Sequence, residues 1–347
     1  MPKTRVDFEL EPPPWLIEDW FPLGHRCMDT APEGSFKTIL GCWIAICVAS
    51  GSPVFGHPVL QGNVIIVDEE TPEPSLKYHL ERFSSGLGFR FKDLPIYLLS
   101  MTGFRFDRKV KMDELLKLVN AIDPVFIRLD SMLAMLPGGR QAQGENDCHL
   151  GEIVRDDLNQ LLSNNRAILL AAHSKKFIAG LTLDEIKEKS MQEIVRGHGS
   201  IVGEGCDTGI IVKKLSSYPN PTRFCIITIA RRQAIPSSKI KYIEMEEEKY
   251  GEGWAKLTEI PEELLPPSEA AKEIFPLFKT PDGKGNYNHS SQWILRTMAF
   301  RDKRYCGSGI TELLRKKAIV ETNPQNYEIN PKRAIQCTKE YLRTLEP

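Results

Sequence analysis

The stretch HRCMDTAPEGSFKTILGCWIAICVASG, residues 25–51, decides the fold of the first part of the chain. HRCMDT predicts a strand, APEGSF a turn that contains glycine, and KTILGCWIAICVASG an amphipathic helix. The turn compares with the phosphate-binding pattern G-x-x-x-x-G-K-[ST], in which backbone N–H groups cradle phosphates at a helix N-terminus. Lys37 and Thr38 match the last two positions, whereas Ala31 and Phe36 replace the glycines. On its own, the stretch fits a phosphate-binding loop and an ordinary strand–turn–helix equally well.

Four continuous apolar runs predict strands that are buried on both faces of a parallel sheet. They are VIIVD (64–68), IYLLS (96–100), VFIRLD (125–130) and AILLAA (167–172). Amphipathic helical segments, PSLKYHLERFSSG and KMDELLKLVNAID among them, lie between these runs. The alternation predicts a doubly wound α/β domain. After Ser200, GIIVKKL, RFCIITIA, KIKYIEM and WAKLTEI predict an antiparallel extension of the sheet, with EEEKYGEG as a hairpin connection.

Polar residues stand at the ends of these strands. Asp130 ends one strand in the manner of an acid that holds Mg²⁺, and one of Asp68, Glu69 and Glu70 at the end of another would orient a water molecule. His173 ends a third strand. Each has an ordinary alternative: a helix-capping Asp, a solvated charge run and a loop histidine. Because the ligand crevice of a parallel sheet lies at the carboxyl ends of its strands, the set together favours a nucleotide site.

Composition sets broad limits on the class of protein. The chain has 347 residues, of which 41% are hydrophobic and 26% charged, and its formal net charge is -1. These values exclude a mostly disordered or collagen-like chain. No apolar run approaches the roughly 18 residues that a membrane span needs, and the eight cysteines show no CxxC pair or zinc spacing. We therefore expect a cytoplasmic protein with reduced thiols and no membrane partner.

The sequence predicts three regions. Residues 1–23 form a Pro-rich arm, residues 24–260 the α/β domain, and residues 261–347 a small α+β winged-helix domain. The last region predicts three helices, in SEAAKEIFPLF, SSQWILRTMAF and GITELLRKKAIV, followed by a β-wing in AIVETNPQNYEINP. From Asn286 to Pro347 there are eleven Lys and Arg against six Asp and Glu, a local excess of positive charge that hints at nucleic acid.

Over residues 14–235 the chain resembles RecA-like P-loop ATPases of the AAA class, and within them the plasmid RepA-type hexameric helicase family. The segments that carry the resemblance, in order, are WLIEDWFPLGH, APEGSFKT, VDEETPEPSLKYHLERF, LDSMLAMLPGG, GENDCHLGEIVRDDLNQLL, AAHSKK and VRGHGSIVGEGCDTGIIV. Two departures are the altered glycines of the first turn and the single histidine of AAHSKK, where the family has two.

The resemblance implies a site for ATP and Mg²⁺. Lys37 would bind the β- and γ-phosphates, Thr38 and Asp130 would hold Mg²⁺, Glu70 would activate water and His173 would sense the γ-phosphate. It also puts Glu145 and Asn146 on a turn of the family, Arg196 and Gly197 in its Arg-Gly-Ser segment, and Asp207 at the Asp that starts its next strand. The nucleotide-binding residues would be Ala31, Pro32, Glu33, Gly34, Ser35, Phe36, Lys37 and Thr38.

The resemblance further implies a ring, for which we expect a hexamer, with nucleotide at the subunit interfaces. Arg231 or Arg232 of a neighbour would then be the arginine finger, and WLIEDW would pack on an adjacent subunit. The alternative for both arginines is a solvent-exposed strand end.

Two regions are candidates for contact with DNA. The first, about residues 175–200, would face single-stranded DNA in the pore through Lys175, Lys176, Lys187, Lys189 and Arg196. Its alternative is a mixed-charge amphipathic helix, LTLDEIKEKSMQEIV. The second is the winged helix, which would bind duplex DNA or, alternatively, another protein.

The leading hypothesis is therefore an ATP-hydrolysing oligomeric DNA-binding motor, a RepA-like replicative helicase or a replication accessory ATPase. A plasmid or other mobile element is the expected context. Two alternatives remain open: a DNA-binding regulator switched by nucleotide, which the altered glycines favour, and a recombination or defence ATPase that does not unwind DNA.

Overall fold

A computed structural model describes most of the first 261 residues and short parts of the remainder. The described residues are 14–136, 148–163, 165–181, 183–196, 202, 206–216, 222–230, 240–249, 251–261, 289–290, 310, 313, 319–323 and 326–329. The chain divides into two compact units, Met1–Ile260 and Pro261–Pro347.

The first unit is built on a nine-stranded sheet with the strand order β11-β10-β9-β8-β3-β7-β6-β4-β5. The strands β3, β4, β5, β6, β7 and β8 are parallel, and β9, β10 and β11 add the antiparallel extension. This order confirms the α/β fold class, with a mostly parallel doubly wound sheet. The bounds are β3 (Arg26–Ala31), β4 (Val64–Asp68), β5 (Ile96–Ser100), β6 (Phe126–Asp130), β7 (Ala167–His173), β8 (Thr208–Ser216), β9 (Arg223–Ala230), β10 (Ile240–Lys249) and β11 (Glu252–Ile260).

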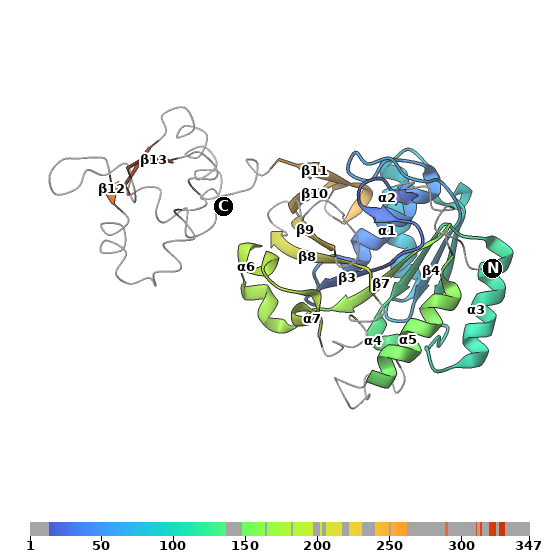
Figure 1. Cartoon of the computed structure of the whole chain (residues 1–347). Coiled ribbons are helices and arrows are strands. Elements are labelled where there is room, and N and C mark those ends of the chain that lie inside the picture. The colour runs from blue at the N-terminus through green and yellow to red at the C-terminus, as the bar shows by residue number, and fades with distance from the viewer. Residues whose placement is uncertain are drawn as a thin grey trace, which may run out of the picture. The chain divides into compact units, whose positions relative to one another are not determined.

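Helices cover both faces of the sheet (Figure 1). Helices α1 (Lys37–Ser50) and α2 (Glu73–Gly86) pack on one face, and α3 (Lys109–Ile122) and α5 (Cys148–Leu161) on the other. Alternate residues of each strand enter the two cores, so Ile66 of β4 lies on the α1 side and the neighbouring Ile65 on the α3 side. The shorter helices are α4 (Met132–Met135), α6 (Leu183–Lys187) and α7 (Met191–Ile194), with 3₁₀ turns η2 (Phe91–Asp93) and η4 (Lys176–Gly180).

Helix α1 is enclosed by the curled sheet. Its residues from Leu40 to Ala49 are all buried, because β11 at the far edge of the sheet reaches α2. Arg82 of α2 forms a 2.6 Å ion pair with Glu247 of β10 and donates a hydrogen bond to the carbonyl oxygen of Gly253. The helix that carries Lys37 and Thr38 is therefore held on several sides.

Residues 14–23, the described part of the arm expected over residues 1–23, pack on the core of the first unit. Strands β1 (Trp15–Ile17) and β2 (Phe21–Pro22) form a small hairpin, and Leu16, Ile17, Trp20 and Phe21 are buried. The indole of Trp20 donates a 2.9 Å hydrogen bond to Thr228 of β9. The apolar residues of WLIEDW thus pack on their own chain, where burying them is favourable.

The second unit contains a three-stranded antiparallel sheet among its described residues. Its strands β12 (His289–Ser290), β13 (Ile319–Asn323) and β14 (Asn326–Ile329) are ordered β12-β14-β13. Ile310 and Leu313 are helical and buried. Ser290, Ile319 and Val320, which the predicted helices included, lie in β12 and β13 instead. The remaining residues of the three predicted helices lie outside the described residues.

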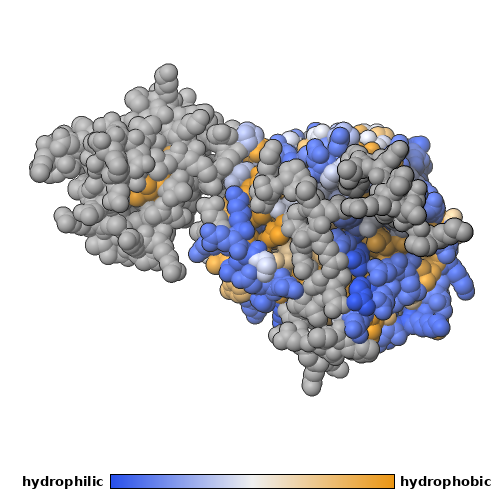
Figure 2. All heavy atoms as spheres, viewed as in Figure 1, coloured by the Kyte–Doolittle hydropathy of each residue, from blue (hydrophilic) through white to orange (hydrophobic). Residues whose placement is uncertain are grey.

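Figure 2 shows a mainly hydrophilic surface on the visible described face of the first unit. Large exposed hydrophobic side chains are scattered along the chain: Leu60, Tyr78, Phe89, Tyr97, Met101, Val110, Phe177 and Leu215. Among the helices that the structure describes, none has both the length and the apolar character that crossing a membrane requires.

Candidate functional site

A sharp turn joins β3 to α1 at the carboxyl edge of the sheet. Gly34 has φ 70°, and Phe36 has φ 64° and ψ 16°. The left-handed conformation costs a non-glycine residue about 1–2 kcal/mol. The Phe36 ring stacks on Phe224 of β9 with the ring centroids 5.5 Å apart, and Lys214 Nζ lies 5.8 Å from the Phe36 centroid. Phe36 thus adopts the left-handed backbone conformation that glycine adopts most easily. Packing against Phe224 holds its side chain beside the loop.

Lys37 is the first residue of α1 and lies almost completely buried between the loop and β7. Its Nζ donates a hydrogen bond to the carbonyl oxygen of Ala31 at 3.2 Å and lies 3.4 Å from His173 Nδ1. Burial lowers the pKa of Lys37, while the charges of Asp29 and Asp130 oppose this shift. Since an ammonium group only donates, Nδ1 of His173 accepts from Lys37, which leaves Nε2 as the ring nitrogen that faces Glu70 as a donor.

Thr38 and Asp130 meet at the start of α1. The Thr38 hydroxyl donates a 3.1 Å hydrogen bond to Asp130 Oδ2. A hydroxyl and a carboxylate side by side are the hard oxygen ligands that Mg²⁺ prefers, and this ion usually keeps waters and substrate phosphates as its other ligands. No group of three or more His, Cys, Asp and Glu with metal-site geometry occurs in the described part of the chain. The two residues therefore fit an ion that enters with a nucleotide.

The three acids after β4 have separate surroundings. Glu69 accepts hydrogen bonds from Thr102 and from the backbone N–H of Gly103, so it holds the loop after β5. Asp68 is buried, and its Oδ1 accepts the backbone N–H groups of Glu70 and Thr71. Of the three acids, only Glu70 lines the pocket described below.

Glu70 lies across from His173. The distance from His173 Nε2 to Glu70 Oε2 is 3.5 Å. The hydrogen bond to His173, only partly opposed by burial, lowers the pKa of Glu70 to about 2. His173 thus links the ammonium group of Lys37 to an ionised glutamate, through its two ring nitrogens.

Arg128 is a buried residue that contacts Asp130 of the site. The sequence did not indicate this role. Its guanidinium is 2% exposed, and contacts Asp29 Oδ1 at 2.6 Å and Asp130 Oδ2 at 3.2 Å. Burial alone would lower the pKa of Arg128, but the charges of Asp29 and Asp130 outweigh it and hold this pKa above its ordinary value. The signal in the sequence was a single charged residue inside the apolar run VFIRLD. The pair fixes the orientation of the Asp130 carboxylate.

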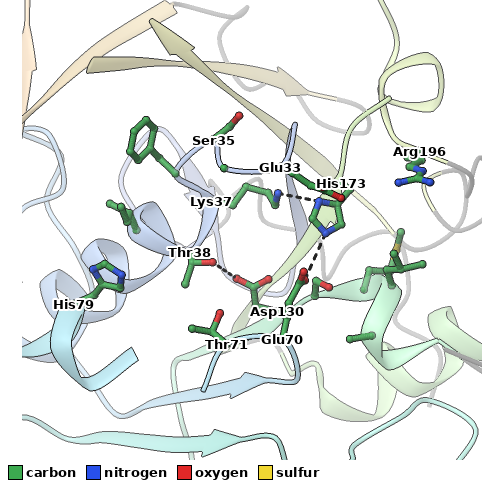
Figure 3. Close-up of a pocket in the computed structure, with 17 residues that line it drawn as sticks. Glu33, Ser35, Lys37, Thr38, Glu70, Thr71, His79, Asp130, His173 and Arg196 are labelled. Carbon is green, nitrogen blue, oxygen red and sulfur yellow. Dashed lines mark hydrogen bonds and ion pairs between the residues drawn. The ribbon is translucent and has the colours of Figure 1, made fainter. Parts of the chain in front are cut away.

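Five of the side chains described above line one pocket of about 880 Å³ (Figure 3). It brings together Lys37, Thr38, Glu70, Asp130 and His173, from the ends of four strands. Of the loop residues predicted to bind nucleotide, Glu33, Gly34, Ser35 and Phe36 also line it, whereas Ala31 and Pro32 do not. The other lining residues are Ile39, Thr71, His79, Ser131, Met132, Leu133, Ala134 and Arg196, none of which the sequence assigned to the pocket.

Figure 3 shows that the pocket has two different ends. His79 lies at one end, and Arg196 lies at the other, beside His173. Burial and the charge of Arg82 lower the pKa of His79, which favours a neutral ring there. His173 contacts Lys37 and Glu70 at the opposite end, so a cation and an ionised carboxylate meet there.

Several predicted residues cannot be placed in this site. Arg231, Arg232, Glu145, Asn146 and Gly197 lie outside the described residues. Asp207 pairs with Arg26 at 3.1 Å, at the amino end of β3 and away from the pocket. The pairing gives Asp207 a part in joining β3 to the start of β8.

Comparison with known proteins adds a family to this geometry. A family model described as an AAA domain matches residues 2–177, a range that contains Lys37, Thr38, Glu70, Asp130 and His173. The search of curated proteins gives no match. Among solved structures, a KaiC-like protein of the hyperthermophilic archaeon Pyrococcus horikoshii aligns with 16% sequence identity and a TM-score of 0.45. The alignment covers 72% of this chain and 96% of that one.

Proposed function

The chain belongs to the AAA domain family of P-loop ATPases, and we propose that it is an oligomeric motor that hydrolyses ATP and acts on DNA. Within this class the proposal is a RepA-like replicative helicase or a replication accessory ATPase. The observation that carries the ATPase part is the convergence of Lys37, Thr38, Glu70 and Asp130 on one pocket at the carboxyl edge of the sheet.

We propose a task in hydrolysis for each of these residues. Lys37 and the backbone N–H groups of the loop bind the β- and γ-phosphates. Thr38 and Asp130 would hold Mg²⁺, which neutralises charge on the phosphates when bound. Because the pKa of Glu70 is about 2, its carboxylate is ionised at neutral pH and accepts a hydrogen bond from the attacking water. His173 contacts both Lys37 and Glu70. When a bound phosphate draws the Lys37 ammonium group away, the Nδ1 atom of His173 therefore changes its hydrogen-bond partner.

The altered loop does not count against hydrolysis. Phe36 keeps the left-handed backbone that the second glycine of the motif supplies, and Lys37 and Thr38 follow it in helical register. The nucleotide-switched regulator, which rests on that alteration, therefore receives no support from the geometry of the loop.

The DNA part of the proposal rests on the sequence. The resemblance to RepA-type helicases and the basic residues between Asn286 and Pro347 support it. The hexameric ring of that family also supports the DNA part of the proposal. In such a ring, Arg231 or Arg232 would act as the arginine finger.

Phosphate release by the full chain, measured with and without single-stranded DNA, tests the proposal. Lys37→Ala is expected to lower the rate by about 10²-fold or more, because it removes the cation that meets the terminal phosphates. Lys77→Ala is the matched control, since Lys77 is an exposed lysine paired with Glu73 on the surface of α2. Equal rates for the wild type and Lys37→Ala would reject an ATPase.

Unwinding separates the motor from its alternatives. We expect the wild type, and not Lys37→Ala, to displace a strand from a forked duplex in the presence of ATP. Hydrolysis that DNA stimulates without strand displacement would favour a recombination or defence ATPase. Particle images with an ATP analogue and single-stranded DNA would show whether a ring encloses the strand.

A further inference from the structure

Arg196 faces the nucleotide pocket, although the sequence grouped it with lysines that would contact DNA. It lines the same pocket as Lys37, Glu70 and His173, and Figure 3 shows it beside His173. The placement follows from the backbone. The backbone N–H of Arg196 donates a 2.9 Å hydrogen bond to the carbonyl oxygen of His173. The backbone N–H of Lys175 donates a 2.8 Å hydrogen bond to the carbonyl oxygen of Ile194.

This short antiparallel ladder ties Arg196 to the end of β7. Ser174 and Val195 form a bridge at its centre, and both are buried. The turn before Arg196 is fixed as well, because Ser190 and Glu193 form a capping box at the start of α7. These backbone contacts therefore hold the main chain of Arg196 next to His173, at the end of β7.

The charges at this end of the pocket suit a phosphate. Among the described residues that line the pocket, Lys37 and Arg196 are the only Lys and Arg, and both lie at the end of the pocket where His173 lies. Lys175, which belongs to the ladder, instead directs its Nζ to the carbonyl oxygen of Gln192. Within the described part of the chain, no carboxylate forms an ion pair with the Arg196 guanidinium.

We propose that Arg196 is a catalytic residue that binds the γ-phosphate of the nucleotide held by its own chain. The proposal rests on the proposed ATPase function and deepens it. In the reaction, the water oxygen bonds to the γ-phosphorus, and the bond to the β–γ bridging oxygen breaks with its electron pair remaining on ADP. The water proton passes to the released phosphate. The planar N–H donors of Arg196 meet the γ-oxygens, where negative charge spreads in the transition state.

Kinetics and binding of single variants test this role. For Arg196→Ala we expect a fall of about 10²-fold in kcat, the effect of losing one charge-stabilising donor, with partial recovery in Arg196→Lys. The affinity for a non-hydrolysable ATP analogue should fall, whereas the affinity for ADP stays within about twofold, because ADP lacks the γ-phosphate. Arg90→Ala is the control, since Arg90 is an exposed arginine that pairs with Asp93 outside the pocket.

Mixing two inactive variants tells whether Arg196 acts in its own chain. Lys37→Ala keeps Arg196, and Arg196→Ala keeps Lys37. If Arg196 serves its own pocket, mixed oligomers regain no activity. Recovery of activity on mixing would overturn the proposal, because it would make Arg196 a residue that acts on a neighbour.

Two further outcomes would also overturn it. One is an Arg196→Ala variant with unchanged kcat and an unchanged ratio of analogue to ADP affinity. The other is the same variant with a loss of DNA affinity alone, which would return Arg196 to the DNA-binding group. The affinity ratio is measured without turnover, so the role of Arg196 is decided even if Lys37→Ala shows that the chain does not hydrolyse ATP.

Discussion

Phe36 keeps the left-handed backbone conformation of the phosphate-binding loop, although it replaces the second glycine of the motif. The left-handed backbone at this position disfavours any residue with a Cβ, yet the phenylalanine ring gains a stacked partner in Phe224. A glycine would remove the strain, and it would also remove the ring. The loop is therefore held by a contact with β9 that the usual motif lacks.

Substitution at Phe36 should reverse the usual ranking of alanine and glycine. Both Phe36→Gly and Phe36→Ala lose the stacked ring, so both should unfold at lower urea concentration than the wild type. Alanine also keeps the strained φ, and we expect it to be about 1 kcal/mol less stable than glycine. Finding alanine the more stable of the two would show that position 36 leaves the left-handed region in the variants.

Asp68 gives the apo protein a specific pH dependence. Burial, with repulsion by Asp130, raises its pKa to about 7, from 3.8 in the unfolded chain. Between these two values the unfolded state ionises while the folded state keeps its proton, so stability falls as pH rises from about 4 to about 7. The loss is on the order of 2–4 kcal/mol.

The variant Asp68→Asn tests this sign. Its amide oxygen can still accept the N–H groups of Glu70 and Thr71, and it does not titrate. In buffer with a chelator, we expect the difference in unfolding free energy between variant and wild type to move in favour of the variant from pH 4 to pH 7. A constant difference across that range would contradict the assignment to Asp68.

At the scale of elements, α1 and β6 meet through Gly41 and Arg128. A Cβ at Gly41 would lie 2.7 Å from Arg128 Nε, and the guanidinium cannot move aside without leaving Asp29. Alanine normally stabilises a helix interior by about 1 kcal/mol relative to glycine. Here we expect Gly41→Ala to destabilise the protein by about 1–3 kcal/mol and to weaken ATP binding. Urea unfolding and nucleotide titration check both effects, and a gain in stability would refute the close approach.

The elements themselves followed from sequence patterns where those patterns were strong. VIIVD and RFCIITIA correspond to β4 and β9 over the same residues, because continuous apolar runs suit buried strands. IYLLS is β5, but the expectation that it is buried on both faces was wrong, because β5 is an edge strand whose residues stay partly exposed. LTLDEIKEKSMQEIV predicted one helix, whereas the structure has α6 and α7 with the capping Ser190 between them. The N-cap at Ser190 starts a new helix inside a stretch whose hydrophobic periodicity alone predicts one continuous helix.

The site was predictable in part for similar reasons. Lys37, Thr38, Glu70, Asp130 and His173 stand at strand ends, which the topology of a parallel sheet brings to one edge. Arg128 and Arg196 were not predictable as members of the site. Their positions depend on a long-range ion pair with Asp29 and on a backbone ladder to His173, which one sequence does not reveal.

At the scale of the whole molecule, every residue that lines the pocket belongs to the first unit, Met1–Ile260. We expect a chain that ends at Ile260 to bind nucleotide with an affinity within about threefold of the full chain, a difference of less than about 0.7 kcal/mol. If the second unit carries DNA binding, the same truncation should lower DNA affinity. Titration of both ligands checks this, and loss of nucleotide binding in a folded fragment would mean that residues after Ile260 complete the site.

The order of strands around β3 also bears on how the protein is made. Strand β3 occupies residues 26–31, yet its two neighbours are β7, which ends at His173, and β8, which begins at Thr208. A nascent chain therefore carries its Lys37 loop past the ribosome exit long before either flanking strand has been translated. Until β11 emerges, the enclosure of the apolar α1 helix is incomplete, and that interval is when a chaperone would have most to shield.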